Sequence, residues 1–257
     1  MTEAEAKPTV DHVLVEMTIA APVEDVWDAL KNPAKIYNWH GWDDPTLKDE
    51  VDFIYGQYGH YDDAAKVLSF GEYEGVAYRF EVERQGDGAT LRVIGAASAD
   101  KEWAGVYEDV VEGWISFAQQ LRFGLERHDI GPRRTIYLNG RAKPDGSAPI
   151  EALGLADLRG KWPGERVAVD LANGEHVEGE VWHHNQWQVG LTVPQWGDGL
   201  LIATDKSVTD KAPHGRGMVI LTTYGMADED FAALEERWRG WWTAHFEEVP
   251  AMEQPCS

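Results

Sequence analysis

The chain has 257 residues, enough for one large domain or two of ordinary size, and its 43% hydrophobic and 26% charged residues are typical of a globular protein. Its 45 acidic and 23 basic residues give a net charge of −22, which repels phosphate groups, so we expect neither nucleic acid nor an anionic membrane as a partner. No apolar run approaches the roughly 20 residues that a membrane-spanning helix needs, and the single cysteine, Cys256, leaves no intramolecular disulfide to form. These features predict a cytoplasmic protein with no membrane insertion.

The N-terminal part of the chain predicts a strand followed by a helix. Residues 1–9 are acidic and rich in alanine, and we expect them to be disordered. Apolar residues, Val13 and Val15 among them, alternate with polar ones over residues 10–19, as in a strand with one buried face. Pro22 and the acidic residues after it then begin a helix, which an Asn-Pro pair ends.

Four strand-like runs come next, and the last two are joined by an Asp-Gly turn. The runs cover residues 51–55, 65–73, 76–85 and 89–97. A helix is predicted over residues 107–128, with a length of roughly 30 Å, because its apolar residues recur at steps of three and four. Strands in one block, with helices outside that block, predict an α+β domain whose sheet has one covered face.

Three short segments of this region resemble a known superfamily. They are the run from Ile19 to Leu30 (Ile-Ala-Ala-Pro-Val-Glu-Asp-Val-Trp-Asp-Ala-Leu), the Asn32-Pro33 pair with Trp39, and the run from Glu112 to Leu121 (Glu-Gly-Trp-Ile-Ser-Phe-Ala-Gln-Gln-Leu). Over residues 10–128 the chain resembles the SRPBCC superfamily, also called START-like or helix-grip proteins. It is most similar to the branch named after the activator of a heat-shock chaperone's ATPase. The resemblance implies a curved antiparallel sheet that wraps around a long C-terminal helix, with an apolar cavity between them.

The second half of the chain repeats the order of strands followed by an amphipathic helix, which we expect over residues 231–246. The same number of residues separates Trp114 from Trp238 and Phe117 from Trp241, so the aromatic residues of the two helices align. We therefore predict a second, degenerate copy of the helix-grip fold, with its first helical section shortened. The alternative is one larger domain that the second half extends.

The expected organisation has four parts. These are a disordered N-terminus at 1–9, a helix-grip domain at 10–128, a second and degenerate helix-grip domain at 133–249, and a flexible tail at 250–257.

Catalytic motifs of known classes are missing, and no Cys or His cluster has metal-ligand spacing, so we expect no metal and no cofactor. Side chains capable of proton transfer gather in the loop after the first helices and on the strand and loop that follow. The catalytic candidates are His40, Asp43, Tyr55 and His60. Aromatic and apolar side chains of the same region, of the strands and of the long helix either line a ligand cavity or fill it as ordinary core. The candidates for ligand binding are Trp39, Trp42, Tyr55, Tyr78, Phe80, Leu91, Trp114, Phe117 and Leu121.

Three functions are compatible with this pattern, and the sequence leaves open whether the protein is an enzyme. The first is a cytoplasmic binding protein that holds a small hydrophobic or aromatic molecule between the sheet and the C-terminal helix. The second is an enzyme of the cyclase, dehydratase or hydrolase kind that uses histidine, tyrosine and aspartate for acid-base chemistry in the same cavity. The third is a chaperone-linked protein-interaction module. A homodimer is also left open, and nothing in the sequence selects a ligand.

Overall fold

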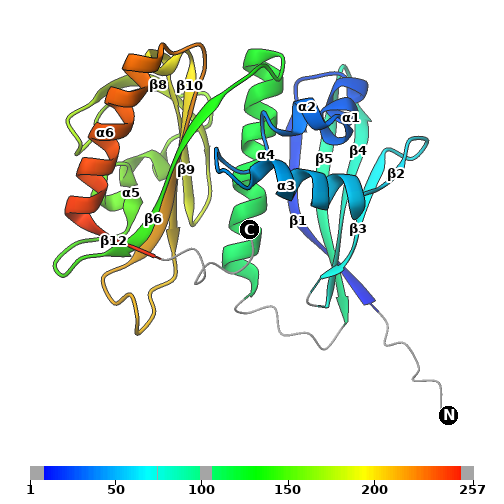
Figure 1. Cartoon of the computed structure of the whole chain (residues 1–257), viewed down its shortest axis with the longest axis horizontal. Helices are drawn as coiled ribbons and strands as arrows, with labels where there is room; N and C mark the ends of the chain where they lie inside the picture. The colour runs from blue at the N-terminus through cyan, green and yellow to red at the C-terminus, as the bar shows by residue number, and fades with distance from the viewer. Residues whose placement is uncertain (1–8, 74, 99–105, 250–257) are drawn as a thin grey trace. The chain divides into compact units, whose positions relative to one another are not determined.

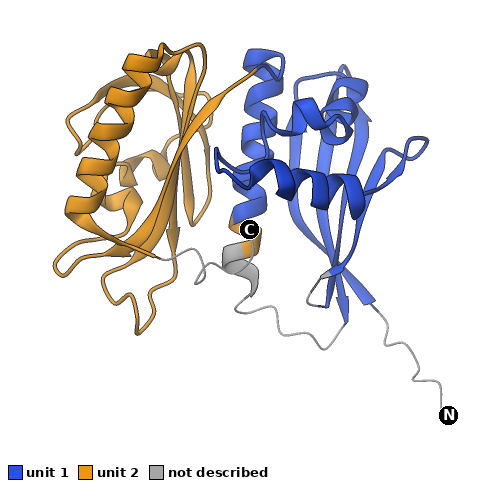
Figure 2. Cartoon of the chain, viewed as in Figure 1, with its two compact units in different colours: residues 1–107, 113–131 blue, residues 108–112, 132–257 orange. Residues whose placement is uncertain are grey.

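A computed structural model describes residues 9–73, 75–98 and 106–249 (Figure 1). The chain divides into two compact units, which are Met1–Tyr107 with Gly113–Gly131, and Glu108–Glu112 with Pro132–Ser257 (Figure 2). The ends that we expected to be disordered or flexible lie outside the described residues, except that the first strand already begins at Thr9. None of the helices in the described ranges combines the length and the hydropathy that crossing a bilayer requires.

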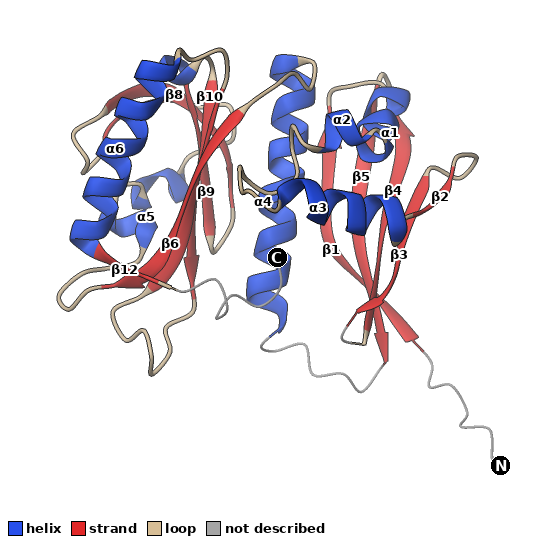
Figure 3. Cartoon of the chain, in the orientation of Figure 1, coloured by secondary structure: helices blue, strands red, loops and turns tan. Residues whose placement is uncertain are grey.

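The first unit is an antiparallel sheet with a long helix packed on it (Figures 1 and 3). Its strands lie in the order β1-β5-β4-β3-β2, and Trp114 of the long helix contacts Tyr78 and Phe80 of the sheet. The elements in chain order are β1 (Thr9–Ile19), α1 (Val23–Lys31), α2 (Pro33–Ile36), α3 (Leu47–Val51), a π-helical turn η1 (Asp52–Gln57), β2 (His60–Asp62), β3 (Val67–Tyr73), β4 (Val76–Gln85), β5 (Gly88–Ser98) and α4 (Val106–His128).

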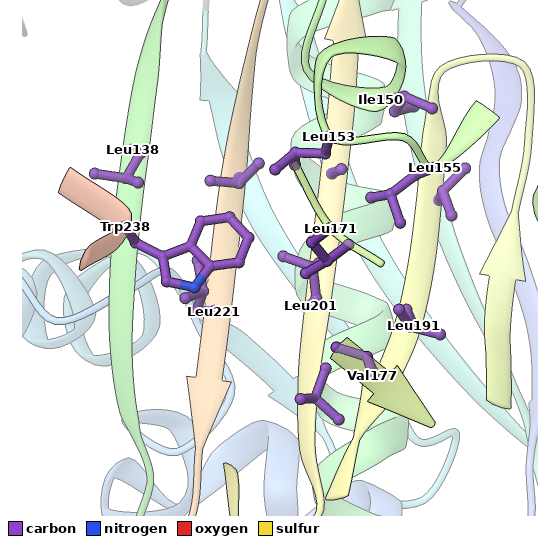
Figure 4. Close-up of a cluster of buried hydrophobic side chains, with 14 of the residues drawn as sticks. Leu138, Ile150, Leu153, Leu155, Leu171, Val177, Leu191, Leu201, Leu221 and Trp238 are labelled. Carbon is purple, nitrogen blue, oxygen red and sulfur yellow. The ribbon is translucent and has the colours of Figure 1, made fainter. Parts of the chain in front are cut away.

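The second unit has the same plan with a larger sheet, whose strands lie in the order β12-β6-β11-β10-β9-β8-β7. Its elements are β6 (Arg134–Ala142), α5 (Pro149–Ala152), a 3-10 turn η2 (Ala156–Gly160), β7 (Arg166–Asp170), β8 (His176–His184), β9 (Gln188–Val193), a 3-10 turn η3 (Pro194–Trp196), β10 (Gly199–Lys206), β11 (Arg216–Thr223), α6 (Asp228–His245) and β12 (Phe246–Glu248). Figure 4 shows Trp238 of α6 among leucine side chains of the sheet, including Leu138 and Leu221, in the apolar core of this unit.

The two units share one topology. In each, the first strand pairs with the last strand of the antiparallel series, short helices follow the first strand, and a long helix follows the last (Figure 3). The predicted α+β class, the helix-grip topology and the repeat are therefore confirmed at the level of the fold. The first helical section is shorter in the second copy, as predicted, because α1 has nine residues and α5 has four.

Helix α1 follows from its local sequence. Glu24 and Asp25 lie in its first turn, where negative charge is favourable, and Val23, Val26 and Leu30 are buried on one face. The Asn32 side chain then accepts a hydrogen bond from the backbone N–H of Ala34 at 3.1 Å and caps α2.

Asp63 connects α1 to the turn between β2 and β3. The indole Nε1 of Trp27 donates to its carboxylate at 2.7 Å, and the Lys31 ammonium lies 2.6 Å from the same oxygen. These two hydrogen bonds lower the pKa of the Asp63 carboxyl, and the bond from Lys31 has the larger effect.

One strand prediction is wrong. Residues 51–55 form the end of α3 and the start of η1 instead of a strand. Val51 and Tyr55 are both buried and lie four residues apart, which is the spacing of one helix face. In a strand, the residue midway between them would lie on the buried face as well. The aromatic and β-branched composition of the run favoured a strand, and burial of one helical face outweighed that preference.

A second difference lies in β1, where the alternation breaks. The register of β1 against β5 shifts between Val13 and Val15, so the strand carries a bulge there. Val13 is 54% exposed as a result, although we expected it on the buried face, whereas Val15 and Ile19 are buried.

Candidate functional site

The candidate site lies in the first unit, where the chain leaves α2 and enters α3. The backbone N–H of His40 donates to the carbonyl of Ile36 at 2.9 Å and continues the helical turn beyond α2. Trp39 is fixed by its indole N–H, which donates to the carbonyl of Ala29 at 2.9 Å. Trp39 and His40 are only 1% and 2% exposed, so the loop carries both rings into the interior.

His40 and Tyr55 form a buried hydrogen-bonded pair. The Tyr55 hydroxyl lies 3.0 Å from Nδ1 of His40, and Nε2 of His40 lies 3.4 Å from the Glu50 carboxylate. A carboxylate only accepts hydrogen bonds, so we assign the imidazole proton to Nε2 and leave Nδ1 to accept from the hydroxyl. Burial raises the pKa of Tyr55 well above its ordinary value, so its hydroxyl stays neutral and can donate.

The π-helical turn η1 is what directs Tyr55 toward His40. Such turns are rare and occur often at functional sites. The Tyr61 hydroxyl donates to the Tyr55 carbonyl at 3.0 Å and ties this turn to β2. Glu50 precedes Tyr55 by five residues, so one continuous helical segment supplies two of the three polar groups.

His40 and Tyr55 form a closed loop of six ring side chains with four further rings, and each ring contacts the next. We call this set the aromatic cluster. The ring centroids lie 5.2 Å apart for His40–Tyr55, 5.6 Å for Tyr55–Phe70, 5.6 Å for Phe70–Phe80, 5.1 Å for Phe80–Trp114, 6.1 Å for Trp114–Phe117 and 4.8 Å for Phe117–His40. These are ordinary separations for edge-on and tilted aromatic pairs. Three of the rings, those of Phe70, Trp114 and Phe117, are only half-buried.

A small void lies between the sheet and α4. Its volume is about 10 Å³, which is room for about one water molecule. It is lined by Leu30, Trp39, Phe80, Leu91, Val93, Trp114, Ala118 and Leu121. Among the side chains that the structure describes, Trp114 and Leu121 of α4 thus border a void much smaller than the cavity that the fold resemblance implied.

The structure brings together some of the candidate residues and separates others. His40 and Tyr55 are hydrogen-bonded, whereas Asp43 is exposed in its loop and His60 is exposed on β2. Of the nine candidates for ligand binding, five line the void, two belong to the aromatic cluster without lining the void, and two contact the cluster from outside. Trp39, Phe80, Leu91, Trp114 and Leu121 line the void; Tyr55 and Phe117 are in the cluster; Trp42 contacts Phe117 at 6.2 Å and Tyr78 contacts Trp114 at 6.0 Å.

Two residues of the site were missed from the sequence. Phe70 lies two positions after buried Leu68 on β3, and this period of two could have indicated that both lie on the same face of the strand. Glu50 gave no signal, because its contact with His40 depends on the helical turn that replaced the predicted strand.

No protein-family model matches this chain, and no curated protein matches it. Several solved structures do match. DynU16, a protein in the dynemicin biosynthetic locus, is 15% identical with a TM-score of 0.32, over 92% of this chain and 95% of its own. The di-domain ARO/CYC BexL from the BE-7585A biosynthetic pathway is 14% identical with a TM-score of 0.35, over 95% of this chain and 100% of its own.

A third match is an AHSA1-like protein from Rhizobium etli, which is 18% identical with a TM-score of 0.34, over 49% of this chain and 87% of its own. At such identities and TM-scores these matches carry no information about activity. The helix-grip assignment rests on the strand order of the two units themselves.

Proposed function

We propose that the first unit binds a small hydrophobic or aromatic molecule between its sheet and α4. The observation that supports this most is the buried, hydrogen-bonded His40–Tyr55 pair within the aromatic cluster. Apolar walls with a few fixed polar groups are the usual composition of a small-molecule site. A cytoplasmic location, expected from the single cysteine, is part of this proposal.

Entry of a ligand requires the interior to rearrange, because the void has room for about one water molecule. Trp114 and Phe117 are half-buried, whereas Trp39, Phe80 and Leu121 are at most 2% exposed. A half-buried ring loses fewer contacts when it turns outward. Trp114 and Phe117 are therefore the side chains that would move, and a ligand ring would take the place of the Trp114 indole against Phe80.

The energetics require polar contacts as well as burial. A ligand ring that buries roughly 200 Å² gains about 5 kcal/mol at ~25 cal/mol per Å². Loss of ligand freedom on association costs a similar amount, at least about 4 kcal/mol. A hydrogen bond to the Tyr55 hydroxyl or to His40 would then supply orientation and the net affinity.

Native mass spectrometry of the purified protein, followed by thermal shift against aromatic and aliphatic compounds, tests the proposal. We expect a co-purified mass or a ligand-dependent rise in melting temperature, and a smaller rise in Tyr55→Phe than in the wild type. The absence of both a bound mass and a shift would refute ligand binding.

A second candidate function is acid-base catalysis at the same site, and the chain of Glu50, His40 and Tyr55 favours it. A carboxylate that orients a buried imidazole against a neutral hydroxyl is an arrangement suited to moving protons on a bound carbonyl compound. Turnover that disappears in His40→Ala and Tyr55→Phe, while both variants still show a ligand-dependent thermal shift, would establish this candidate.

The small size of this void favours the remaining alternative, a protein-interaction module, because such a role needs no cavity. A protein partner recovered at stoichiometric yield, together with no response to any small molecule, would support that role over the other two.

A further inference from the structure

The second unit carries a surface groove of about 750 Å³, which is independent of the site proposed above and within the range of small-molecule sites. It lies along the first half of α6, between the turn that joins β7 to β8, the turn η3 and the loop from β11 into α6. Half-buried Met226, with Trp196 and Leu234, each 2% exposed, supplies the apolar part of a lining that also holds polar side chains.

Arg237 of α6 lies in this lining and is fixed by a carboxylate. Its Nε lies 2.9 Å from Oε1 of Glu175, which also accepts a hydrogen bond from Nε1 of Trp238 at 2.7 Å. Trp238 is fully buried, and the Glu175 side chain is only 15% exposed. The guanidinium is therefore held by a carboxylate that a core side chain positions.

The two terminal nitrogens of Arg237 remain available to a ligand. Within residues 9–73, 75–98 and 106–249, no acceptor pairs with Nη1 or Nη2, and the side chain is 45% exposed. His176 is the other basic side chain of the lining, and the Asp170 carboxylate lies 2.6 Å from its Nδ1. A guanidinium fixed at Nε and open at both Nη atoms matches the two oxygens of a carboxylate.

The far end of the groove has the opposite charge. Asp230 lies two helical turns before Arg237, roughly 10 Å away along α6 at 1.5 Å per residue, and its side chain is exposed. Leu234 lies between them on the same helix face. The lining thus offers a cation, an apolar middle and an anion, in that order.

We propose that this groove binds a small monocarboxylate with an apolar body of about eight carbons. The carboxylate lies on the Nη atoms of Arg237, and the hydrocarbon covers Leu234, Trp196 and Met226. Asp230 repels a second negative charge at the other end, so a dicarboxylate of the same length is rejected.

The test uses the full chain and four probes that share one carbon skeleton: octanoate, octanol, octylammonium and octanedioate. Affinities come from titration followed by backbone amide NMR, with the amides of Gly174, Gly197 and Gly225 as reporters because they line the groove. We expect octanoate to shift these amides and to bind about tenfold more tightly than octanol or octanedioate, a difference of about 1.4 kcal/mol. Octylammonium should bind more weakly than octanoate, because its ammonium gains only the exposed Asp230 carboxylate and is repelled by Arg237.

Two arginine variants supply the matched comparison. Arg237→Gln should weaken octanoate binding about tenfold and leave octanol binding unchanged. Arg237→Lys should recover only part of the loss, because an ammonium cannot present the two parallel N–H donors of a guanidinium. Arg239→Gln is the control, since Arg239 is equally exposed on α6, pairs with Glu235 and lies outside the groove lining. Equal affinity for octanoate and octanol, unchanged octanoate binding in Arg237→Gln, or shifts confined to first-unit amides would each overturn the proposal.

Discussion

Trp114→Ala tests whether the Trp114 indole occupies the space that a ligand would fill. The centroid of its ring lies 5.1 Å from that of Phe80, 6.0 Å from that of Tyr78 and 6.1 Å from that of Phe117. The ring also borders the void of about 10 Å³. Removing it joins the space of the lost ring to that void. Apolar cavities of roughly 150 Å³ stay dry and bind benzene-sized molecules, so the variant should bind indole.

The magnitude follows from burial. Truncating a buried tryptophan to alanine costs about 3–5 kcal/mol, and half-buried Trp114 places this variant near the lower limit, at about 3 kcal/mol. Indole at 100 times its dissociation constant restores about 2.7 kcal/mol by mass action, provided that it binds only the folded state. The variant with indole should therefore approach the stability of the wild type.

Urea unfolding followed by far-ultraviolet circular dichroism, with and without indole, measures both effects without interference from indole fluorescence. Trp162→Ala is the matched control, because Trp162 is 81% exposed and its removal leaves no cavity. Indole that stabilises the wild type, Trp162→Ala and Trp114→Ala equally, or none of them, would refute the assignment of this space to a ligand.

Three further predictions concern single side chains. Tyr55→Phe removes the hydroxyl from a buried 3.0 Å hydrogen bond and should lower the free energy of unfolding by about 1–3 kcal/mol in urea; a loss below about 0.5 kcal/mol would contradict the bond. Gly197→Ala should destabilise the fold by about 2–6 kcal/mol, because φ is +73° and a Cβ would collide with the Tyr224 carbonyl oxygen. Gly174→Ala, with φ +88° and open space around the new Cβ, should cost only about 1–2 kcal/mol. Equal melting temperatures of the two variants would disprove the clash. Asp63 has a lowered pKa, so its bonds stabilise the fold above the unfolded value of 3.8 and are lost as pH falls through the lower folded value. Asp63→Asn should therefore melt below the wild type at pH 7 and together with it in strong acid, and a constant difference across this range would argue against the linkage.

Sequence patterns predicted the elements whose burial repeats along the chain. The helix over residues 107–128 was recognisable because its apolar side chains recur every three or four residues, and α4 covers Val106–His128. The repeat of the fold was recognisable because both halves of the chain show strands followed by an amphipathic helix, and two copies of one topology have the same order of elements. His40 and Tyr55 were both named as candidates, although Tyr55 was expected on a strand.

Other features depend on contacts between residues far apart in the chain. The bulge that exposes Val13 is set by the pairing of β1 with β5. The alternation of apolar and polar residues within β1 alone does not reveal one extra residue in the pairing. The His40–Tyr55 bond needs a π-helical turn, which neither periodicity nor composition distinguishes from a strand in so short a run.

The sequence by itself determined that one face of the α4 helix must be covered by the sheet, since leaving an apolar face of that length exposed to water is unfavourable. Only the tertiary structure decided whether a cavity remains beneath it. That outcome depends on how Trp114, Phe80 and Leu121 interlock at the density of a protein interior, where a shift of one ring separates an open pocket from room for a single water. Residue types set the volume available to fill the space, and the strand and helix positions set the space itself.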